Sequence, residues 1–306
     1  MTVLVTGWVA IDEVETPFGR REGMLGGSAT CAALAASLFT DVRLLAAVGE
    51  DFPDELRRLL ASRERIDLAG LETVPGTTSR WGARYGWDLN SRDTLYTIVG
   101  VNENWEPRLP PGWERSEVLF LAAAAPERQR RIAEQVRGRR LVMADTIQLF
   151  IDTALDELRE TFRRVDFVSV NESEARQLTG APSVARAARE LLKLGPRGAI
   201  VKLGEYGAIF AGDGEYFMLP GYPLEEVVDP TGAGDAFAGA FLGFLDAAGD
   251  VSPRSIRRAI VYASTVASFQ VEGFGPSRLL ALTRAEVEER YRAFRRLTHF
   301  EVLGEW

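Results

Sequence analysis

The sequence predicts an α/β protein with a mostly parallel central sheet. Short β-branched apolar runs alternate with helical patterns of about ten residues, which is typical of βαβ units. One run, residues 167–170, is apolar at almost every position, as expected of a strand buried on both faces of a sheet. The length of 306 residues is enough for a single domain with a large core.

The predicted elements follow one another along the whole chain. Strands are predicted over residues 3–9, 43–48, 118–121, 141–144, 167–170 and 199–202. Helices are predicted over residues 29–39, 54–63, 127–137, 154–163, 172–179 and 184–194. Three further helices, over residues 235–245, 253–269 and 284–294, make the C-terminal third helical. No internal repeat or low-complexity linker interrupts this order.

Residues 70–104 break the alternation because they contain no good helical pattern. Segments 77–85 and 94–101 are β-rich, and turn-forming residues separate them at 88–91. A structureless loop of this length is uncommon in a compact domain, so we predict a small β hairpin or sheet inserted into the α/β body. Two interpretations stay open, a lid over an active site and an edge decoration or dimerisation flap that would pair two copies of the chain.

The segment 70–104 is also unusually aromatic. At the period of a strand, Trp81, Ala83, Tyr85 and Trp87 share one face. Such a face stacks well on a nucleobase or a sugar ring, and it equally forms the small core of a lid or a contact between two copies of the chain. The pattern alone does not decide between these uses.

Composition excludes several classes of function. The net charge of −8 argues against nucleic acid or an anionic membrane as the main partner. The single cysteine, Cys31, and the single histidine, His299, argue against a disulfide framework, a cysteine zinc site and a Ser-His-Asp triad. The first seven residues resemble a strand rather than a signal peptide, and no apolar run is long enough to span a membrane. We therefore expect a cytoplasmic protein.

The segment 229–239, Asp-Pro-Thr-Gly-Ala-Gly-Asp-Ala-Phe-Ala-Gly, carries the chemistry. A glycine-rich turn runs directly into an apolar helix, so backbone N–H groups and the helix dipole can converge on an anion. Gly232 and Gly234 allow the backbone to approach a phosphate closely. Asp235 lies at the mouth of this anion hole, where a carboxylate is unfavourable unless it accepts a proton from an attacking hydroxyl.

Other nucleotide-binding motifs are missing from the chain. No Gly-Lys pair exists for a Walker A loop, and the third glycine of a Rossmann fingerprint would fall at Phe237. Inside the predicted helix, Gly239 and Gly243 share a face and lower helix stability by about 1 kcal/mol each. A neighbouring strand or helix is therefore expected to approach that face closely.

The segment 229–239 resembles the C-terminal signature of the ribokinase-like, or PfkB, family of carbohydrate and nucleoside kinases. Gly26-Gly27 before a helix of small residues resembles the family's N-terminal signature, and Asn171–Glu174 resembles its Asn-x-x-Glu motif. Residues 201–208 resemble its nucleotide-side strand and turn. The resemblance covers essentially residues 1–306. It implies a ribokinase-like three-layer αβα sandwich with a mostly parallel central sheet, in which residues 70–104 form a small β lid.

The resemblance also implies a role for each matching residue. Asp235 would be the general base, and the anion hole would be formed by Gly232, Ala233 and Gly234. Asn171 and Glu174 would organise Mg²⁺ through water, although Glu172 and Glu174 also suit a helix N-terminus as capping residues. The acceptor would contact Asp12, Gly26, Gly27, Ser28 and Trp81. The nucleotide would lie against Asn171, Lys202, Gly204, Gly207, Ala263 and Ala267. Asp229 and Thr231 would belong to a site for a monovalent cation such as K⁺.

The function implied is transfer of the ATP γ-phosphate to an alcohol group of a small sugar, with Mg²⁺ and K⁺ as ions. Two alternatives stay open: an adenosine-like nucleoside kinase, which the aromatic lid favours, and a catalytically idle nucleotide-binding regulator on the same fold. The intact set of Asp235, Asn171 and Glu174 argues against an idle protein. Where the family often has an asparagine shortly after Gly-Gly, this chain has Ser28, Thr30 and Cys31. The identity of the sugar therefore stays open.

Overall fold

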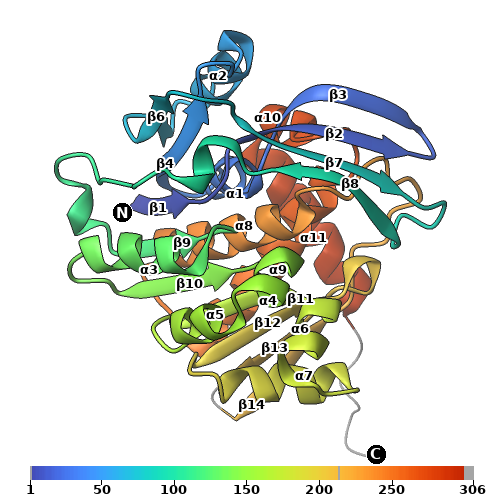
Figure 1. The fold of residues 1–306 in the computed structure, drawn as a ribbon. Coiled ribbons are helices and arrows are strands. Elements are labelled where there is room, and N and C mark those ends of the chain that lie inside the picture. Colours follow the sequence, from blue (N-terminus) through green and yellow to red (C-terminus); the bar gives the residue numbers. More distant parts are fainter. Residues whose placement is uncertain (1, 213, 300–306) are drawn as a thin grey trace, which may run out of the picture.

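A computed structural model describes residues 2–212 and 214–299 of the chain. A long sheet runs through the middle of the molecule, helices cover both of its faces, and a smaller sheet lies beside it (Figure 1). The predicted α/β class with a mostly parallel central sheet and a small separate sheet is thereby confirmed. None of the helices in the described ranges combines the length and the apolar character that a membrane span needs.

Ten of the described strands form the central sheet. In spatial order they are β14 (Glu215–Leu219), β13 (Ala208–Gly212), β12 (Gly198–Lys202), β11 (Phe167–Asn171), β10 (Leu141–Asp145), β9 (Val118–Leu121), β1 (Thr2–Thr6), β4 (Asp41–Gly49) and β5 (Ile66–Asp67), with β6 (Leu71–Val74) also paired to β4. The pairings β12–β13 and β13–β14 are antiparallel and the others are parallel. The carboxyl ends of the parallel strands therefore meet along one edge.

The two faces of the sheet bury separate cores, which makes three layers. Val3 and Val5 of β1 point into one core and Leu4 into the other, as the alternation of a strand requires. The first core is covered by α1 (Ser28–Ala36), α2 (Asp54–Ala61), α8 (Ala233–Ala248), α9 (Pro253–Gln270), α10 (Ser277–Ala281) and α11 (Arg284–Thr298). The second is covered by α3 (Pro126–Gln135), α4 (Gln148–Thr153), α5 (Leu155–Phe162), α6 (Glu172–Thr179) and α7 (Val184–Leu192). Three short 3₁₀ helices, Gly100–Glu103, Trp113–Arg115 and Gly204–Tyr206, lie in connections.

The small sheet has the order β3 (Gly19–Gly26), β2 (Ala10–Thr16), β7 (Ser79–Tyr85) and β8 (Arg92–Ile98). Only β7 and β8 come from residues 70–104, whereas β6 of that segment joins the central sheet. The strands β2 and β3 escaped the sequence analysis because charged residues and glycines interrupt their apolar pattern. Exposed ion pairs such as Arg20–Glu13 and Arg84–Glu15 link neighbouring strands, and the inner face buries only a few apolar side chains such as Val14, Ala83 and Tyr85.

The helices α1 and α8 lie in direct contact, and this contact explains the two glycines inside α8. Every residue of α1 is buried. A Cβ atom at Gly239 would lie 2.1 Å from the carbonyl oxygen of Ala32, and one at Gly243 would lie 2.9 Å from Cα of Ala36. The neighbour expected from the sequence is therefore α1, and the approach is tightest at Gly239.

We predict that Gly239→Ala destabilises the fold. The new methyl group would overlap the backbone of α1, and overpacking of a core costs about 1–3 kcal/mol, which outweighs the gain of about 1 kcal/mol in helix propensity. Gly243→Ala is the matched control, because it adds the same methyl group to the same helix face where more space is available. Urea unfolding should give a lower midpoint for Gly239→Ala than for Gly243→Ala, and equal midpoints would contradict this packing.

Candidate active site

Two glycine-rich turns meet at the carboxyl edge of the parallel strands. Gly26–Gly27 precedes α1, and Gly232–Gly234 begins α8. A Cβ atom at Gly232 would lie 2.5 Å from Sγ of Cys31 in the first turn of α1, so the two turns are in contact. The crevice outside the carboxyl ends of the strands is where open α/β sheets bind ligands.

The segment predicted as an anion hole has the required backbone. Gly232 is the N-cap of α8 with a φ of 76°, and among the described residues no side chain caps this helix. The first N–H groups of a helix have no partner within it and can bind an anion. In α8 the N–H of Ala233 also donates to the carbonyl of Pro230 at 3.3 Å, a long bond that an anion would replace. A Cβ atom at Gly234 would lie 2.9 Å from Nζ of Lys202. The lysine amine therefore lies directly beside the anion hole, as its assignment to the nucleotide site requires.

Lys202 is held in this position by Asp145, a residue that the sequence analysis missed. The Nζ atom lies 2.9 Å from Oδ2 of Asp145, although β11 separates the two strands that carry these residues. The other oxygen of Asp145 accepts the N–H of Thr146 at 2.7 Å. Burial works to lower the pKa of Lys202, but Asp145, Glu174 and Asp235 together raise it, so the amine is charged. Asp145 directly follows the predicted strand 141–144, but the sequence does not show that Lys202 reaches it across β11.

Asp235 lies in the first turn of α8, half-buried and close to other carboxylates. Withdrawal from water and the charge of Asp145 raise the pKa of Asp235 from 3.8 to about 7, while Lys202 opposes the shift. A carboxylate with a pKa near 7 is a stronger base than an ordinary aspartate. The same charges act on Glu174, whose burial raises its pKa to about 7.

The Asn-x-x-Glu motif forms a helix cap in this structure. Oδ1 of Asn171 accepts the N–H of Glu174 at 2.9 Å, and Oε2 of Glu174 accepts the N–H of Asn171 at 2.8 Å. In the described ranges, no three acidic, histidine or cysteine side chains converge on one metal position. The oxygen donors and their negative charge suit Mg²⁺ that keeps its waters and binds phosphate oxygens, as the water-mediated role of Asn171 and Glu174 requires.

The predicted acceptor residues Asp12, Gly26, Gly27 and Ser28 lie together in one corner of the site. Asp12 of β2 is buried and accepts the N–H of Gly27 at 3.2 Å, and a Cβ atom at Gly26 would overlap its carboxyl group. Burial raises the pKa of Asp12 to about 7. Ser28 is also buried, and its hydroxyl donates weakly to the carbonyl of Ala123 at 3.5 Å.

Aromatic rings lie near this corner. Trp8 follows β1, and its ring meets Phe150 of α4 edge to face with 6.3 Å between the ring centres. Trp81 of β7 lies against the apolar cluster of the small sheet and carries the guanidinium of Arg92 on its ring. Trp87, in contrast, lies beyond the end of β7 and is 88% exposed.

The remaining nucleotide-side predictions lie in different environments. Gly204 and Gly207 flank the short turn between β12 and β13, as expected for a turn that faces a nucleotide. Ala267 of α9 is half-buried, whereas Ala263 is fully buried in the core and offers no exposed surface to a ligand.

Asp229 and Thr231, assigned to a monovalent cation, make bonds within the protein. Oδ1 of Asp229 accepts the N–H of Thr231 at 2.8 Å, and Oδ2 accepts the N–H of Gly275 at 2.9 Å. The carbonyl of Thr231 accepts from Nε2 of Gln270 at 2.8 Å. Sequence reasoning found the two loops but missed Gln270, which belongs to an ordinary helical pattern.

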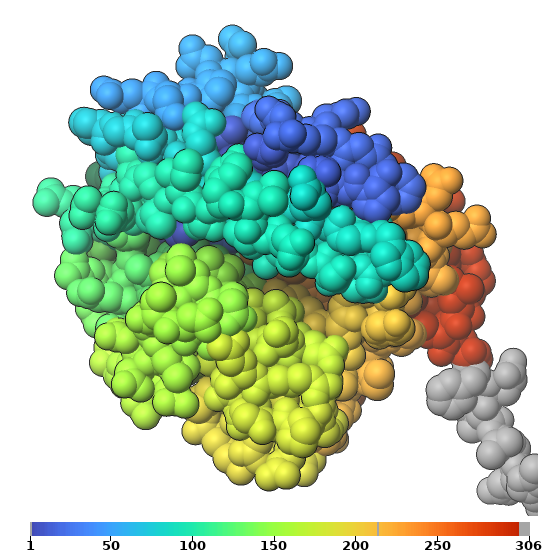
Figure 2. All heavy atoms as spheres, turned by 45° about the vertical axis from the view of Figure 1, so that its right-hand side comes forward, coloured from blue at the N-terminus to red at the C-terminus, as the bar shows by residue number. Residues whose placement is uncertain are grey.

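The small sheet touches the body at two places around this site. The hydroxyl of Thr231 donates to the Tyr85 hydroxyl at 3.1 Å, and Nδ2 of Asn90, in the turn between β7 and β8, donates to Glu205 at 2.9 Å. Phe274 packs into the same apolar cluster as Tyr85. In Figure 2 the blue and teal strands accordingly lie against the yellow and orange segments of the body. The small sheet thus spans from the anion hole to the nucleotide-side turn.

Comparison with known proteins agrees with this geometry. The model of the pfkB family carbohydrate kinases matches residues 10–281. The chain belongs to this family. It is therefore a phosphotransferase that acts on an alcohol group, and its substrate is a sugar or a nucleoside.

Relatives of different specificity resemble the chain. The cytidine kinase of Thermococcus kodakarensis is 35% identical over 248 residues, which cover 79% of this chain and 87% of that protein. The deoxyribokinase of Salmonella typhimurium is 29% identical over 83% of each chain. The structure of Burkholderia thailandensis nucleoside kinase in complex with inosine superposes with a TM-score of 0.78 at 20% identity, covering 96% of this chain and 97% of that one. At that identity the likeness establishes the ribokinase fold alone.

We predict opposite effects of Asp235→Asn on activity and stability. Loss of a general base lowers kcat by about 10²–10⁴. The folded protein keeps the Asp235 proton up to a pH near 7, whereas the unfolded chain loses it near 3.8, so stability from this group falls as the pH rises through that window. Asparagine removes the unfavourable charge. The free variant should therefore melt at a higher temperature than the wild type at pH 8, and the difference in melting temperature should shrink as the pH is lowered toward 3.8.

Asp250→Asn is the control for this experiment. Hydrogen bonds from Ser252 and Ser255 lower the pKa of Asp250, so its charge stabilises the start of α9. This variant should melt at a lower temperature at pH 8 and keep its kcat. An Asp235→Asn enzyme with normal kcat would exclude Asp235 as the base.

Proposed function

We propose that the chain phosphorylates a hydroxyl group of a nucleoside, with ATP as the donor, Mg²⁺ as the divalent ion and cytidine as the first candidate acceptor. The observation that carries phosphoryl transfer is the position of Asp235 in the first turn of α8, beside the uncapped N–H groups and Lys202. The choice of a nucleoside is supported by the similarity to the cytidine kinase and by the paired rings of Trp8 and Phe150, since the backbone of Trp8 contacts Gly27.

The residues of the site suit an in-line transfer. Asp12 and the backbone of Gly26–Gly27 would hold hydroxyl groups of the acceptor. Asp235 takes the proton of the attacking hydroxyl of the acceptor. The oxygen of that hydroxyl forms a bond to the γ-phosphorus while the bond from the γ-phosphorus to the leaving ADP oxygen breaks. The N–H groups of residues 232–234 and the amine of Lys202 stabilise the charge on the transferring group. Mg²⁺, near Asn171 and Glu174, would neutralise charge on the phosphates when bound.

A free sugar is the second candidate acceptor. The similarity to the deoxyribokinase favours it. An idle regulator is disfavoured because the base, the anion hole and a charged lysine all lie together.

A panel of acceptors tests the proposal. Purified protein with ATP and Mg²⁺ should convert cytidine to its monophosphate with a higher kcat/KM than it shows for ribose, deoxyribose, fructose, adenosine or inosine. The reaction is measured by the release of ADP and by the mass of the product. A higher value for a free sugar would replace the nucleoside proposal. Absence of transfer to any sugar or nucleoside, with ATP bound, would favour the regulator.

We also propose that the small sheet is a lid that closes over the acceptor and excludes water. Acceptor binding should slow amide hydrogen exchange in β2, β3, β7 and β8. Tyr85→Phe removes the hydroxyl that contacts Thr231 and should raise the KM for the acceptor several-fold. Trp87→Ala is the control, because Trp87 is exposed beyond the strand and its loss should leave KM unchanged.

Unchanged exchange at a saturating acceptor concentration would exclude the lid.

A homodimer through the small sheet stays a prediction from the sequence. The edge strand β8 exposes Leu95 and Ile98, which is the surface that such a dimer would use.

A further inference from the structure

We propose that the side-chain amide of Gln270 joins two loops that a monovalent cation is expected to join, so that phosphoryl transfer by this chain is independent of K⁺. Gln270 is the last residue of α9 and is fully buried. It lies between the loop 229–231 and the loop 271–277, where the resemblance to the family implies a cation. The proposal rests on the proposed function, because its effect is measured on the transfer reaction.

The amide group bridges the two loops. Nε2 of Gln270 donates to the carbonyl oxygen of Thr231 at 2.8 Å and to that of Gly275 at 2.9 Å. Two buried carbonyl oxygens that face each other need a donor or a cation between them, since an unpaired buried polar group is costly. A glutamine amide has two N–H groups, and this one uses both of them on carbonyls of different loops.

Asp229 joins the same loops with the opposite polarity. Its carboxylate accepts one N–H from Thr231 and one from Gly275. Each loop therefore gives a carbonyl to Gln270 and an N–H to Asp229. The oxygens of Asp229 and Thr231 that the resemblance assigns to a cation are thus bonded to N–H groups in this structure, and the two donors of Gln270 already join the two loops.

The bridge also reaches the anion hole. A Cβ atom at Gly232 would lie 3.4 Å from Nε2 of Gln270, so the amide is packed against the first glycine of the hole. By fixing the carbonyl of Thr231, Gln270 fixes the direction in which the chain enters residues 232–234. An ion that organised these loops would act in the same way, by favouring the competent backbone arrangement. Gln270 is therefore a positioning residue, and it contacts no reacting atom.

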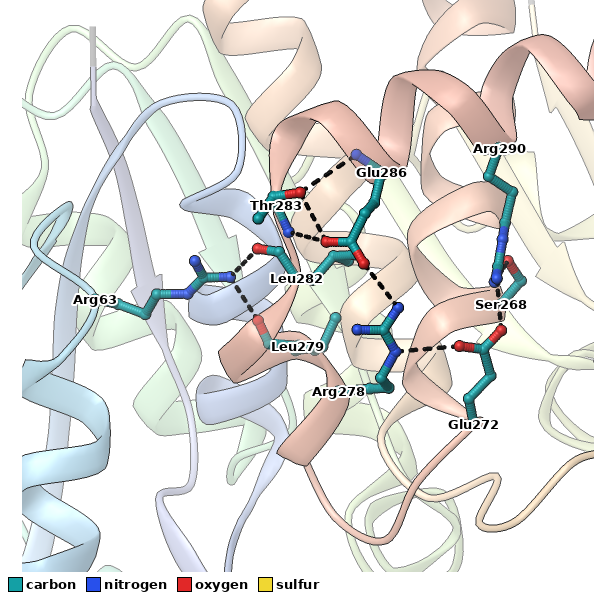
Figure 3. A network of polar contacts seen from close by, with 9 residues as sticks. All are labelled: Arg63, Ser268, Glu272, Arg278, Leu279, Leu282, Thr283, Glu286 and Arg290. Atoms are coloured by element: carbon teal, nitrogen blue, oxygen red, sulfur yellow. Dashed lines mark hydrogen bonds and ion pairs between the residues drawn. The ribbon is translucent and has the colours of Figure 1, made fainter.

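An outer network holds the loop that follows Gln270 (Figure 3). Arg278 connects Glu272 at 3.2 Å with Glu286 of α11 at 3.1 Å. Arg290 donates to Glu272 at 2.6 Å and to Ser268 at 3.0 Å. These half-buried side chains attach the end of α9 and the loop 271–277 to α10 and α11, so the loop is held from outside as well as by the amide.

The first test is a K⁺ titration of the wild type. Initial rates are measured with the acceptor that the panel identifies, in Tris buffer at saturating ATP and Mg²⁺, while KCl replaces choline chloride at constant ionic strength. We expect a rate that changes by less than about twofold. A rise of about fivefold or more, as for an ion coupled to catalysis, would overturn the proposal. Oε1 of Gln270 is buried without a partner in the described ranges, and an ion lodged against it would produce that rise.

The second test converts the amide into a cation site. Gln270→Glu replaces two donors by a carboxylate that faces two carbonyl oxygens, and such a group of oxygens suits a cation. We expect the rate of this variant without K⁺ to be at least about tenfold below that of the wild type, and KCl to restore it. KCl should also raise the melting temperature of the variant and leave that of the wild type unchanged. Full activity of Gln270→Glu without K⁺ would show that the bridge is not needed and would overturn the proposal.

Glu272→Gln is the matched control, since it weakens the outer network and leaves the amide bridge in place. It should lower the melting temperature and create no K⁺ dependence, and a K⁺ requirement in this variant would also overturn the proposal.

The proposed function and this inference are contradicted by different results. A wild type that transfers phosphate to no acceptor contradicts the proposed function, whereas a wild type that transfers it only with K⁺ contradicts the inference alone.

Discussion

The contact between α1 and α8 is the constraint on which the rest of the site depends. With Gly239 against the backbone of Ala32, the two helices lie closer than side chains would allow, and both begin at the carboxyl edge of the sheet. The turn before one helix therefore meets the turn before the other. Cys31 fills the remaining space beside Gly232, and burial raises the pKa of its thiol, so the group stays uncharged. Small residues in the core thus bring the acceptor corner and the anion hole together.

The charges of the site are unfavourable in the free protein. Asp145, Glu174 and Asp235 lie near Lys202, and Asp12 lies close enough to Asp235 to act on its charge. Burial raises the pKa of each of these carboxyl groups. This arrangement suits the proposed function, in which a divalent cation would relieve the repulsion between carboxylates and the α8 N-terminus and Lys202 would face the phosphates. The buried carboxyl groups lower the stability of the free protein, as expected of a site organised to bind the charges that the substrate brings.

The sequence predicted six strands of the central sheet, β1, β4, β9, β10, β11 and β12, but missed β5, β6, β13 and β14 of that sheet and β2 and β3 of the small sheet. A strand buried on both faces, such as β11, is apolar at nearly every position, and its pattern requires no knowledge of its neighbours. The strands β2 and β3 are stabilised by pairing and by exposed charges, which appear only when distant segments meet. Glycine-rich turns could likewise be found in the sequence, because their backbone chemistry is local.

Residues that act through distant partners could not be found in this way. Asp145 becomes important because Lys202 reaches it across a strand, and Gln270 because two loops present their carbonyls to it. The capping box at Asn171 shows the converse case. Its spacing is visible in the sequence and satisfies both a helix cap and a role near a metal, so the pattern alone could not separate them.

Thr231 shows how the anion hole is tied to the rest of the molecule. Its N–H donates to Asp229, its carbonyl accepts from Gln270 and its hydroxyl donates to Tyr85. These partners belong to its own loop, to the end of α9 and to the small sheet. Because each polar group of Thr231 has a different partner, the position of the next residue, Gly232, is determined by all three elements at once. The geometry of the anion hole thus depends on both the α9 loop and the small sheet. If the small sheet closes as proposed, this dependence would link closure over the acceptor to readiness for phosphoryl transfer.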